Sequence, residues 1–284
     1  MKELFDASAP APKWGVELLQ EAIDLYNPSH VFGLFSGGHD SLTACHHAAQ
    51  HPAFSGCVHI NTGTGLKETR DYVYATCERF GWPLKEYRAL EDCGQSYEEL
   101  VLKFGFPGPH GHGMMYQRLK ERAVIMLTRE HKQHAKDKIV LVSGCRSQES
   151  ERRMGTTEPI QHRGARIWVA IIHPMSKCEV NEYIAEHGLP RNPVVDLIHK
   201  SGECLCGAFA KKHELAELEL WFPERAAEIR ALEARVRERG FPWGWEDAPP
   251  RWWLEQQRGQ EFMFEMEDAV EPCEQHLCWA CNRE

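Results

Sequence analysis

Short apolar runs alternate with amphipathic segments over the first two thirds of the chain. Runs such as 31–35 and 138–144 are mostly apolar and end at Ser or Gly, which is typical of strands buried on both faces. Segments such as 14–27 repeat apolar residues at helical spacing, and others end at Gly or Pro. The pattern predicts strands at 31–35, 57–61, 84–90, 138–144 and 166–174, and helices at 14–27, 41–50, 68–81, 114–133 and 177–188.

This alternation predicts an α/β fold, with a parallel sheet covered by helices on both faces. Such sheets bind ligands at the carboxyl ends of their strands. Three polar loops, SGGHDS (36–41), NTGTG (61–65) and GCRSQESER (144–152), each follow a predicted strand. We therefore expect the three loops to form one site.

The pattern changes after residue 188. Residues 212–240 are charged and helical in spacing, and residues 241–259 are rich in Trp and Pro. We expect an α/β domain over 1–195 and a mainly helical, Cys-containing appendage over 196–284. The Trp-rich stretch suits the core of that appendage, while stacking on nucleic-acid bases is the alternative.

Composition narrows the class of protein. With 284 residues and no apolar run long enough for a membrane span, the sequence predicts a soluble chain. Its N-terminus lacks the apolar core of a signal peptide, so we expect a cytoplasmic protein. The net charge of −9 argues against a general nucleic-acid coat but leaves a local basic patch open.

The loop SGGHDS has the composition of a phosphate cradle. Gly37 and Gly38 allow positive φ and close backbone approach, and free N–H groups at the next helix attract anions. Ser36 and Ser41 offer hydroxyls, and Asp40 could hold Mg²⁺ or orient the loop. The alternative is a tight turn in which Ser or Asp only caps the helix. The lysine-bearing GxxxxGK[ST] loop does not occur.

With these motifs the chain resembles the PP-loop ATP pyrophosphatases, and among them the phosphoadenosine phosphosulfate (PAPS) reductase family. NTGTGLKET (61–69), YQRLKE (116–121) and GCRSQESERR (144–153) resemble further motifs of that branch, in order, over roughly residues 30–210. The resemblance implies the adenine-nucleotide alpha-hydrolase-like (HUP-type) fold. It also implies cleavage of ATP between its α and β phosphates, or binding of an already adenylylated sulfate.

The resemblance assigns roles to individual residues. Arg146, Arg152 and Lys120 would act on the phosphates or the substrate, although Lys120 is equally compatible with a solvated helix face. The nucleotide, with Mg²⁺, would be bound by the polar and glycine positions of the three loops, namely Ser36, Gly37, Gly38, Asp40, Ser41, Thr62, Gly63 and Gly144.

The cysteines indicate a metal centre. Eleven cysteines without a signal peptide disfavour a disulfide framework. Cys204 and Cys206 form a CxC pair, and Cys278 and Cys281 a distant CxxC, which together give four thiolates. Some branches of the resembled family carry a [4Fe–4S] cluster beside the nucleotide, so we favour that cluster over Zn²⁺. Cys273 is an alternative fourth ligand.

The tail lacks the Glu-Cys-Gly-x-His motif that carries the catalytic Cys of PAPS reductases. We therefore expect an ATP pyrophosphatase that adenylylates a target for sulfur insertion, with DNA phosphorothioation as the leading case. The alternatives are a PAPS reductase-type sulfonucleotide reductase, a tRNA sulfur transferase and a nucleotide-binding regulator without turnover. The expected partners are a nucleic acid and a sulfur-donor protein such as a cysteine desulfurase, with no membrane, and a homodimer stays open.

Overall fold

A six-stranded sheet forms the centre of the computed structural model, which describes residues 13–148 and 158–255. The strand order is β3-β2-β1-β4-β6-β5, and all neighbouring pairs are parallel except β5 with β6. The predicted parallel sheet is therefore confirmed. The strands are β1 (His30–Leu34), β2 (Phe54–Asn61), β3 (Leu84–Arg88), β4 (Ile139–Ser143), β5 (Ile160–Arg163) and β6 (Arg166–Ala170).

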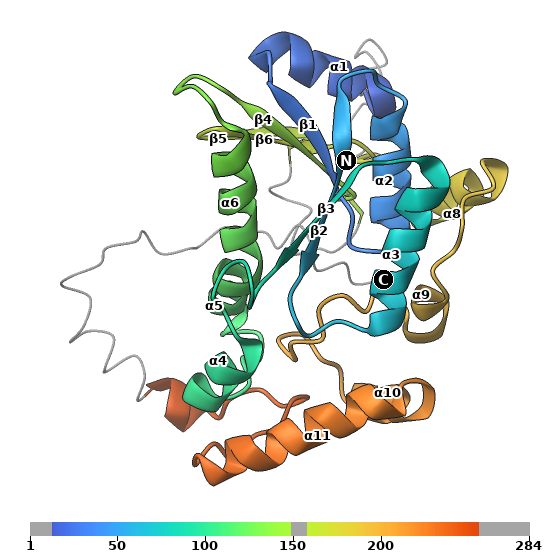
Figure 1. Cartoon of the computed structure of the whole chain (residues 1–284). Coiled ribbons are helices and arrows are strands. Elements are labelled where there is room, and N and C mark those ends of the chain that lie inside the picture. Colours follow the sequence, from blue (N-terminus) through green and yellow to red (C-terminus); the bar gives the residue numbers. More distant parts are fainter. Residues whose placement is uncertain (1–12, 149–157, 256–284) are drawn as a thin grey trace, which may run out of the picture.

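Helices cover both faces of this sheet, as the apolar strands require (Figure 1). Helices α1 (Gly15–Tyr26), α2 (His39–Ala49), α3 (Lys67–Phe80) and α8 (Lys177–Glu186) share an aliphatic core with one face. Helix α6 (Arg122–His131) packs on the other face, against Phe32, Leu141 and Trp168. Because β1 and β4 lie between both layers, their carboxyl ends hold the adjoining loops rigidly.

The predicted helix 114–133 contains a break in its hydrogen-bond pattern. It consists of α5 (His112–Tyr116), the π-helical turn η1 (Gln117–Glu121) and α6. A π turn holds one residue more than the α-helical turn it replaces, and such turns often occur at functional sites. Lys120 lies on this turn and is buried. Among the described residues, no helix is both long and apolar enough to cross a bilayer.

The C-terminal part forms a second, aromatic core. Helices α10 (Glu214–Trp221) and α11 (Pro223–Glu238) lie beyond the strands, at the bottom of Figure 1. Their core includes Trp243 and Trp245, but also residues of α4 (Tyr97–Phe104) and η1. Most of the Trp-rich stretch therefore packs internally, while Trp252 is exposed. The short helix α9 (Pro193–Ile198) precedes this part, and the division at residue 195 stays a prediction.

Candidate functional site

The loop SGGHDS joins β1 to α2 at the carboxyl end of the sheet. Gly37 has a φ of 81°, and a Cβ there would lie 2.6 Å from Thr69 Cγ2. Ser36 Oγ donates to Ser41 Oγ (3.1 Å), which donates to the Gly38 carbonyl (2.9 Å). The loop is thus held tightly at the start of an 11-residue helix, whose N–H groups and dipole favour an anion.

A buried ion pair joins this loop to the end of β4. Arg146 Nε donates to Asp40 Oδ2 at 2.9 Å, and the two side chains are 5% and 0% exposed. Burial raises the pKa of Asp40, and the Arg146 guanidinium opposes that rise. Asp40 Oδ1 has no hydrogen-bond partner among the described residues, so one oxygen remains that suits a cation such as Mg²⁺.

Gly144 explains how the two loops come so close. A Cβ at this position would lie 2.6 Å from the Asp40 carbonyl carbon and 2.7 Å from Ser41 N. Any side chain would therefore push β4 away from the first turn of α2. Gly144 thus has a packing role in the described structure, and its contact with a nucleotide stays a prediction.

The loop after β2 contributes Thr62 and Gly63. Gly63 has a φ of 74° and open space where a Cβ would be, so a ligand can approach its backbone. Thr62 is buried, and its hydroxyl donates to the Glu203 carbonyl at 3.0 Å. Thr62 N also donates to Glu203 Oε1, at 3.2 Å, so of its polar groups the carbonyl would make the predicted adenosine contact.

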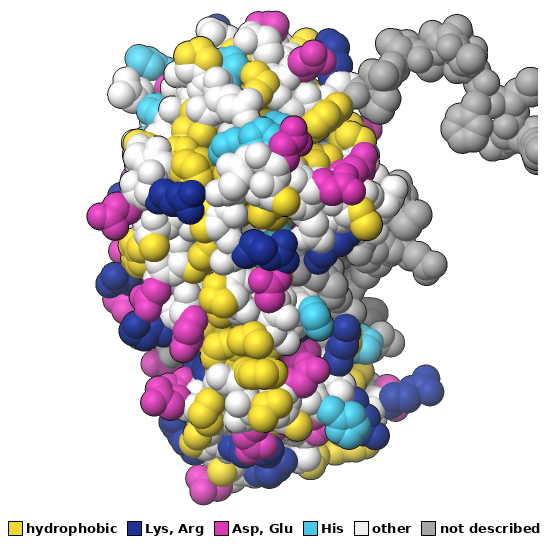
Figure 2. All heavy atoms as spheres, turned by 90° about the vertical axis from the view of Figure 1, so that its right-hand side faces the viewer, with side chains coloured by type: hydrophobic (Ala, Val, Ile, Leu, Met, Phe, Trp, Pro, Cys, Tyr) yellow, Lys and Arg dark blue, Asp and Glu magenta, His cyan; other side chains and the backbone are white. Residues whose placement is uncertain are grey.

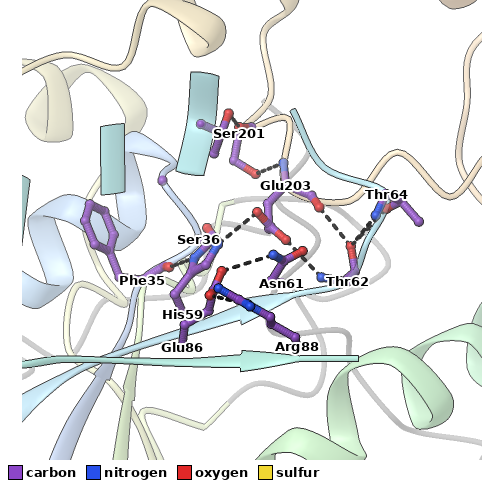
Figure 3. Close-up of polar contacts among 12 residues, drawn as sticks. Phe35, Ser36, His59, Asn61, Thr62, Thr64, Glu86, Arg88, Ser201 and Glu203 are labelled. Atoms are coloured by element: carbon purple, nitrogen blue, oxygen red, sulfur yellow. Dashed lines mark hydrogen bonds and ion pairs between the residues drawn. The ribbon is translucent and has the colours of Figure 1, made fainter. Parts of the chain in front are cut away.

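A second buried ion pair lies under the loop after β2 and was not predicted from the sequence (Figure 3). Glu203 Oε2 is 3.1 Å from His59 Nε2, and His59 Nδ1 donates to the Phe35 carbonyl at 2.8 Å. Burial opposes the charged form of His59, but Glu203 outweighs it and raises the pKa of His59. His59 and Glu203 are far apart in sequence. The position of Glu203 directly before the CxC pair was the only sequence signal for this ion pair.

His39 is another site residue that sequence reasoning passed over. It is 1% exposed, and its ring nitrogens have no hydrogen-bond partner among the described residues. Burial lowers the pKa of His39 to about 4, so the ring is neutral near pH 7. Its place as the variable residue of SGGxDS was the available signal.

The CxC pair lies directly beside these loops. Cys206 is buried, and its interaction with the Cys204 thiol, together with burial, raises its pKa well above the usual range. The charge of Lys120 is close enough to oppose that rise. Lys120 is itself buried, so the alternative of a solvated helix face is wrong. Its contact with a phosphate stays a prediction.

Several predicted site residues cannot be placed. Arg152, Cys278 and Cys281, and the alternative ligand Cys273, lie outside the described residues. Within residues 13–148 and 158–255, no group of three or more His, Cys, Asp or Glu is arranged to hold a metal ion. Two thiols fit half of a four-Cys site, and the complete ligand set stays a prediction.

Comparison with known proteins identifies the region that carries these loops. The sequence profile of the phosphoadenosine phosphosulfate reductase domain family matches residues 30–201. Among solved structures, the chain resembles phosphoadenylyl-sulfate (PAPS) reductase from Candida auris in its phosphate complex. That match has a TM-score of 0.48 and 18% identity, covering 65% of this chain and 84% of the other. A search of curated proteins found no match.

Proposed function

Because the chain belongs to the phosphoadenosine phosphosulfate reductase domain family, we propose that it binds ATP and cleaves it to AMP and pyrophosphate. The cleavage activates a target for sulfur insertion. The observation that carries this proposal is the SGGHDS loop, which leads into the first turn of α2 without a side-chain cap and whose Asp40 is fixed by Arg146. This arrangement suits the pyrophosphate end of ATP.

The chemistry begins with attack by an oxygen of the target on the α-phosphorus. The bond from this phosphorus to the bridging oxygen breaks, and pyrophosphate leaves with the negative charge. The N–H groups of the loop stabilise that charge, and Arg146 holds Asp40 in place. Mg²⁺ at Asp40 Oδ1 would supply further charge neutralisation. A sulfide-level nucleophile (hydrosulfide or a donor thiolate) then attacks the activated atom of the target, the bond from that atom to the adenylylated oxygen breaks, and AMP leaves with that oxygen.

A sulfonucleotide reductase is the second candidate, because the family profile spans all three loops. The same phosphate cradle would then hold PAPS, and a protein thiolate would attack its sulfur while the S–O bond to the phosphate breaks and the adenosine bisphosphate leaves. A second thiol, such as that of thioredoxin, would then form a disulfide and release sulfite. Cys204 is partly exposed and lies in the segment bonded to the loop after β2, so a thiol is close to the nucleotide loops. Pyrophosphate release from ATP separates the two candidates, because PAPS reduction produces none.

A nucleic-acid acceptor is supported by a basic pocket next to the CxC segment. The pocket has a volume of about 180 Å³ and contains Lys200, Lys211 and Lys212, with Glu214 and Glu217. Lys200 is ion-paired with Glu214, so Lys211 and Lys212 are the lysines that would contact a phosphate. His199, at the end of α9, and His213, at the start of α10, also line it. Basic, His and acidic side chains occur together in the lower right of Figure 2. The pocket suits backbone phosphates.

The cysteines would hold the metal centre of the proposal. Cys204 and Cys206 provide two thiols in the described structure, and Cys278 and Cys281 are the proposed partners. A [4Fe–4S] cluster bound there would supply one-electron redox chemistry, whereas Zn²⁺ would only fix the segment. Anaerobic purification with metal analysis distinguishes them. Full metal retention in a Cys278→Ser plus Cys281→Ser variant would contradict this ligand set.

The test of the main proposal measures pyrophosphate release from ATP and PAPS reduction with thioredoxin on one preparation. Asp40→Asn keeps a hydrogen-bond acceptor for Arg146 but removes the charge, so we expect at least about 100-fold slower pyrophosphate release. Asp24→Asn, on the exposed side of α1, is the matched control. Full activity of Asp40→Asn would contradict the proposed site, and PAPS reduction without ATP cleavage would favour the reductase.

A further inference from the structure

The segment 201–206, which carries the CxC pair, is hydrogen-bonded to the loop after β2 and to the start of α3. Leu66 N donates to the Gly202 carbonyl (2.9 Å), and Leu205 N donates to Thr64 Oγ1 (3.0 Å). Thr69 Oγ1 donates to the Ser201 carbonyl (2.6 Å), and its methyl group is the one that leaves no room for a Cβ at Gly37. Movement of this segment must therefore disturb the loop after β2.

The side chain of Glu203 extends this connection into the sheet. It is 3% exposed, and its Oε1 accepts from Thr62 N (3.2 Å) while its Oε2 faces His59. His59 comes from the middle of β2 and bonds the carbonyl of Phe35, the residue directly before the phosphate loop. One chain of contacts thus runs from the CxC segment through Glu203 and His59 to the Phe35 carbonyl, directly before the phosphate loop, as Figure 3 shows.

A buried ion pair is not needed for stability alone. Taking two charges out of water offsets much of their attraction, and well-packed apolar residues are often as stable in the same place. An apolar pair, however, cannot make directional hydrogen bonds, and only polar atoms can bond the Phe35 carbonyl and Thr62 N. The two contacts lie at the ends of the strands that carry the proposed phosphate and adenosine loops.

We propose that His59 and Glu203 are positioning residues that fix the CxC segment against the phosphate loop, so that the thiols and the nucleotide keep one relative geometry. This proposal rests on the proposed nucleotide site, but the connection itself exists without nucleotide. It assigns Glu203, the residue before Cys204, a role separate from metal binding. Loss of the connection should slow the reaction of bound nucleotide more than it weakens nucleotide binding.

Kinetics of three variants test this role. Glu203→Gln preserves an acceptor for Thr62 and can donate to a neutral His59, so its activity should stay within about threefold of wild type. The double variant His59→Leu plus Glu203→Leu fills the same space with apolar side chains and should fold. Its kcat for pyrophosphate release should fall about tenfold, while its KM for ATP stays nearly unchanged. Glu203→Ala leaves His59 unpaired and should be the least stable variant. If the double Leu variant is as active as wild type, the pair is merely structural and the proposal is wrong.

Amide hydrogen exchange without nucleotide provides a readout that does not depend on activity. The double Leu variant should exchange faster in 201–206, 61–66 and also 36–41, because the connection through Phe35 is lost. Glu233→Gln is the matched control, since this buried carboxylate bonds Trp245 N (2.7 Å) in the aromatic core. It should leave 36–41 unchanged.

The two measurements separate the failure of this inference from that of the proposed function. Faster exchange confined to 201–206 would overturn the connection even if the wild type cleaves ATP. If the wild type releases no pyrophosphate but the exchange reaches 36–41, the connection stands and the ATP-cleaving function is wrong.

Discussion

The sheet and the aromatic core of the C-terminal part satisfy their backbone polar groups in different ways. In the sheet, neighbouring strands pair the N–H and C=O groups, so that β4 needs little beyond apolar side chains. In the aromatic core, side chains donate hydrogen bonds to the backbone carbonyls. Trp243 Nε1 donates to the Phe106 carbonyl, Trp245 Nε1 to the Leu205 carbonyl and Tyr97 OH to the Cys206 carbonyl.

This difference indicates which substitutions each region tolerates. A sheet strand should accept apolar residues of similar size, because its hydrogen bonds belong to the backbone. The aromatic core should depend on the identity of its residues, because a Trp replaced by Phe leaves a buried carbonyl without its donor. Two of these carbonyls belong to the CxC segment, so the aromatic core also shapes the candidate site.

The largest effect should come from Trp245→Ala. The side chain is 1% exposed, so its removal should lower the free energy of unfolding by about 4 kcal/mol. Trp252→Ala is the control, because that side chain is half exposed. Urea titration with near-ultraviolet detection measures both. A loss for Trp245→Ala no larger than for Trp252→Ala would remove the proposed dependence on aromatic identity.

The second effect concerns pH in the sheet region. Burial lowers the pKa of His47 to about 4, against about 6.5 in an unfolded chain. Between these values the unfolded chain binds a proton that the folded chain does not, so stability falls as pH falls from about 6.5 to 4. His47→Gln should remove about 3 kcal/mol of that dependence. His134→Gln is the control, because that exposed side chain should not change the pH dependence of stability. If wild type and His47→Gln show the same free energy of unfolding at every pH, the burial effect is contradicted.

Gly37→Ala should have a smaller effect on stability but a specific effect on the site. Because position 37 has a positive φ and the added methyl group would meet Thr69, the substitution should lower the free energy of unfolding by about 2 kcal/mol. Gly81→Ala also has a positive φ (65°) but open space, so only about 1 kcal/mol is expected. Calorimetric titration should show weaker ATP binding for Gly37→Ala alone. Normal ATP affinity in this variant would place the nucleotide elsewhere.

The smallest effect tests the basic pocket. Lys211→Glu plus Lys212→Glu should weaken binding of duplex DNA about tenfold at low salt and reduce the salt dependence. Lys132→Glu plus Lys136→Glu changes charge equally at the amino end of β4, where no DNA contact is proposed. Fluorescence anisotropy at two salt concentrations measures both. Equal losses in the two variants would show a general charge effect instead of a site.

Much of the sheet could be predicted because its strands are buried runs bounded by Gly and Pro. All predicted strands and helices of the first 188 residues occur, although Ile171 and Ile172 lie beyond the end of β6. Strand β5 was missed because its sequence, IQHR, has no apolar run or clear alternation. Helices α4 and α9 were too short for a helical period to be visible.

In the candidate site, too, features local in sequence could be predicted, whereas contacts between distant residues could not. The SGGHDS loop is local in sequence, and the structure places it at a strand end as predicted. The pairing of His59 with Glu203 depends on residues brought together only by the fold, and His59 looks like an ordinary strand position. For Lys120 the sequence left a site role and a solvated face equally open, because its neighbours are charged. Its burial on the π-helical turn could not be predicted from a helical period.

The π turn η1 couples the number of residues in this helix to the rotation of α5 relative to α6. Each residue of an α-helix advances the chain by about 100° and 1.5 Å. Deleting one residue from 117–121 would therefore convert η1 to an α-helical turn and twist α5 and the loop before it relative to α6, rather than simply shortening the helix. Lys120 is buried with this additional residue in place, and we expect an insertion or deletion there to rotate Lys120 away from its present position.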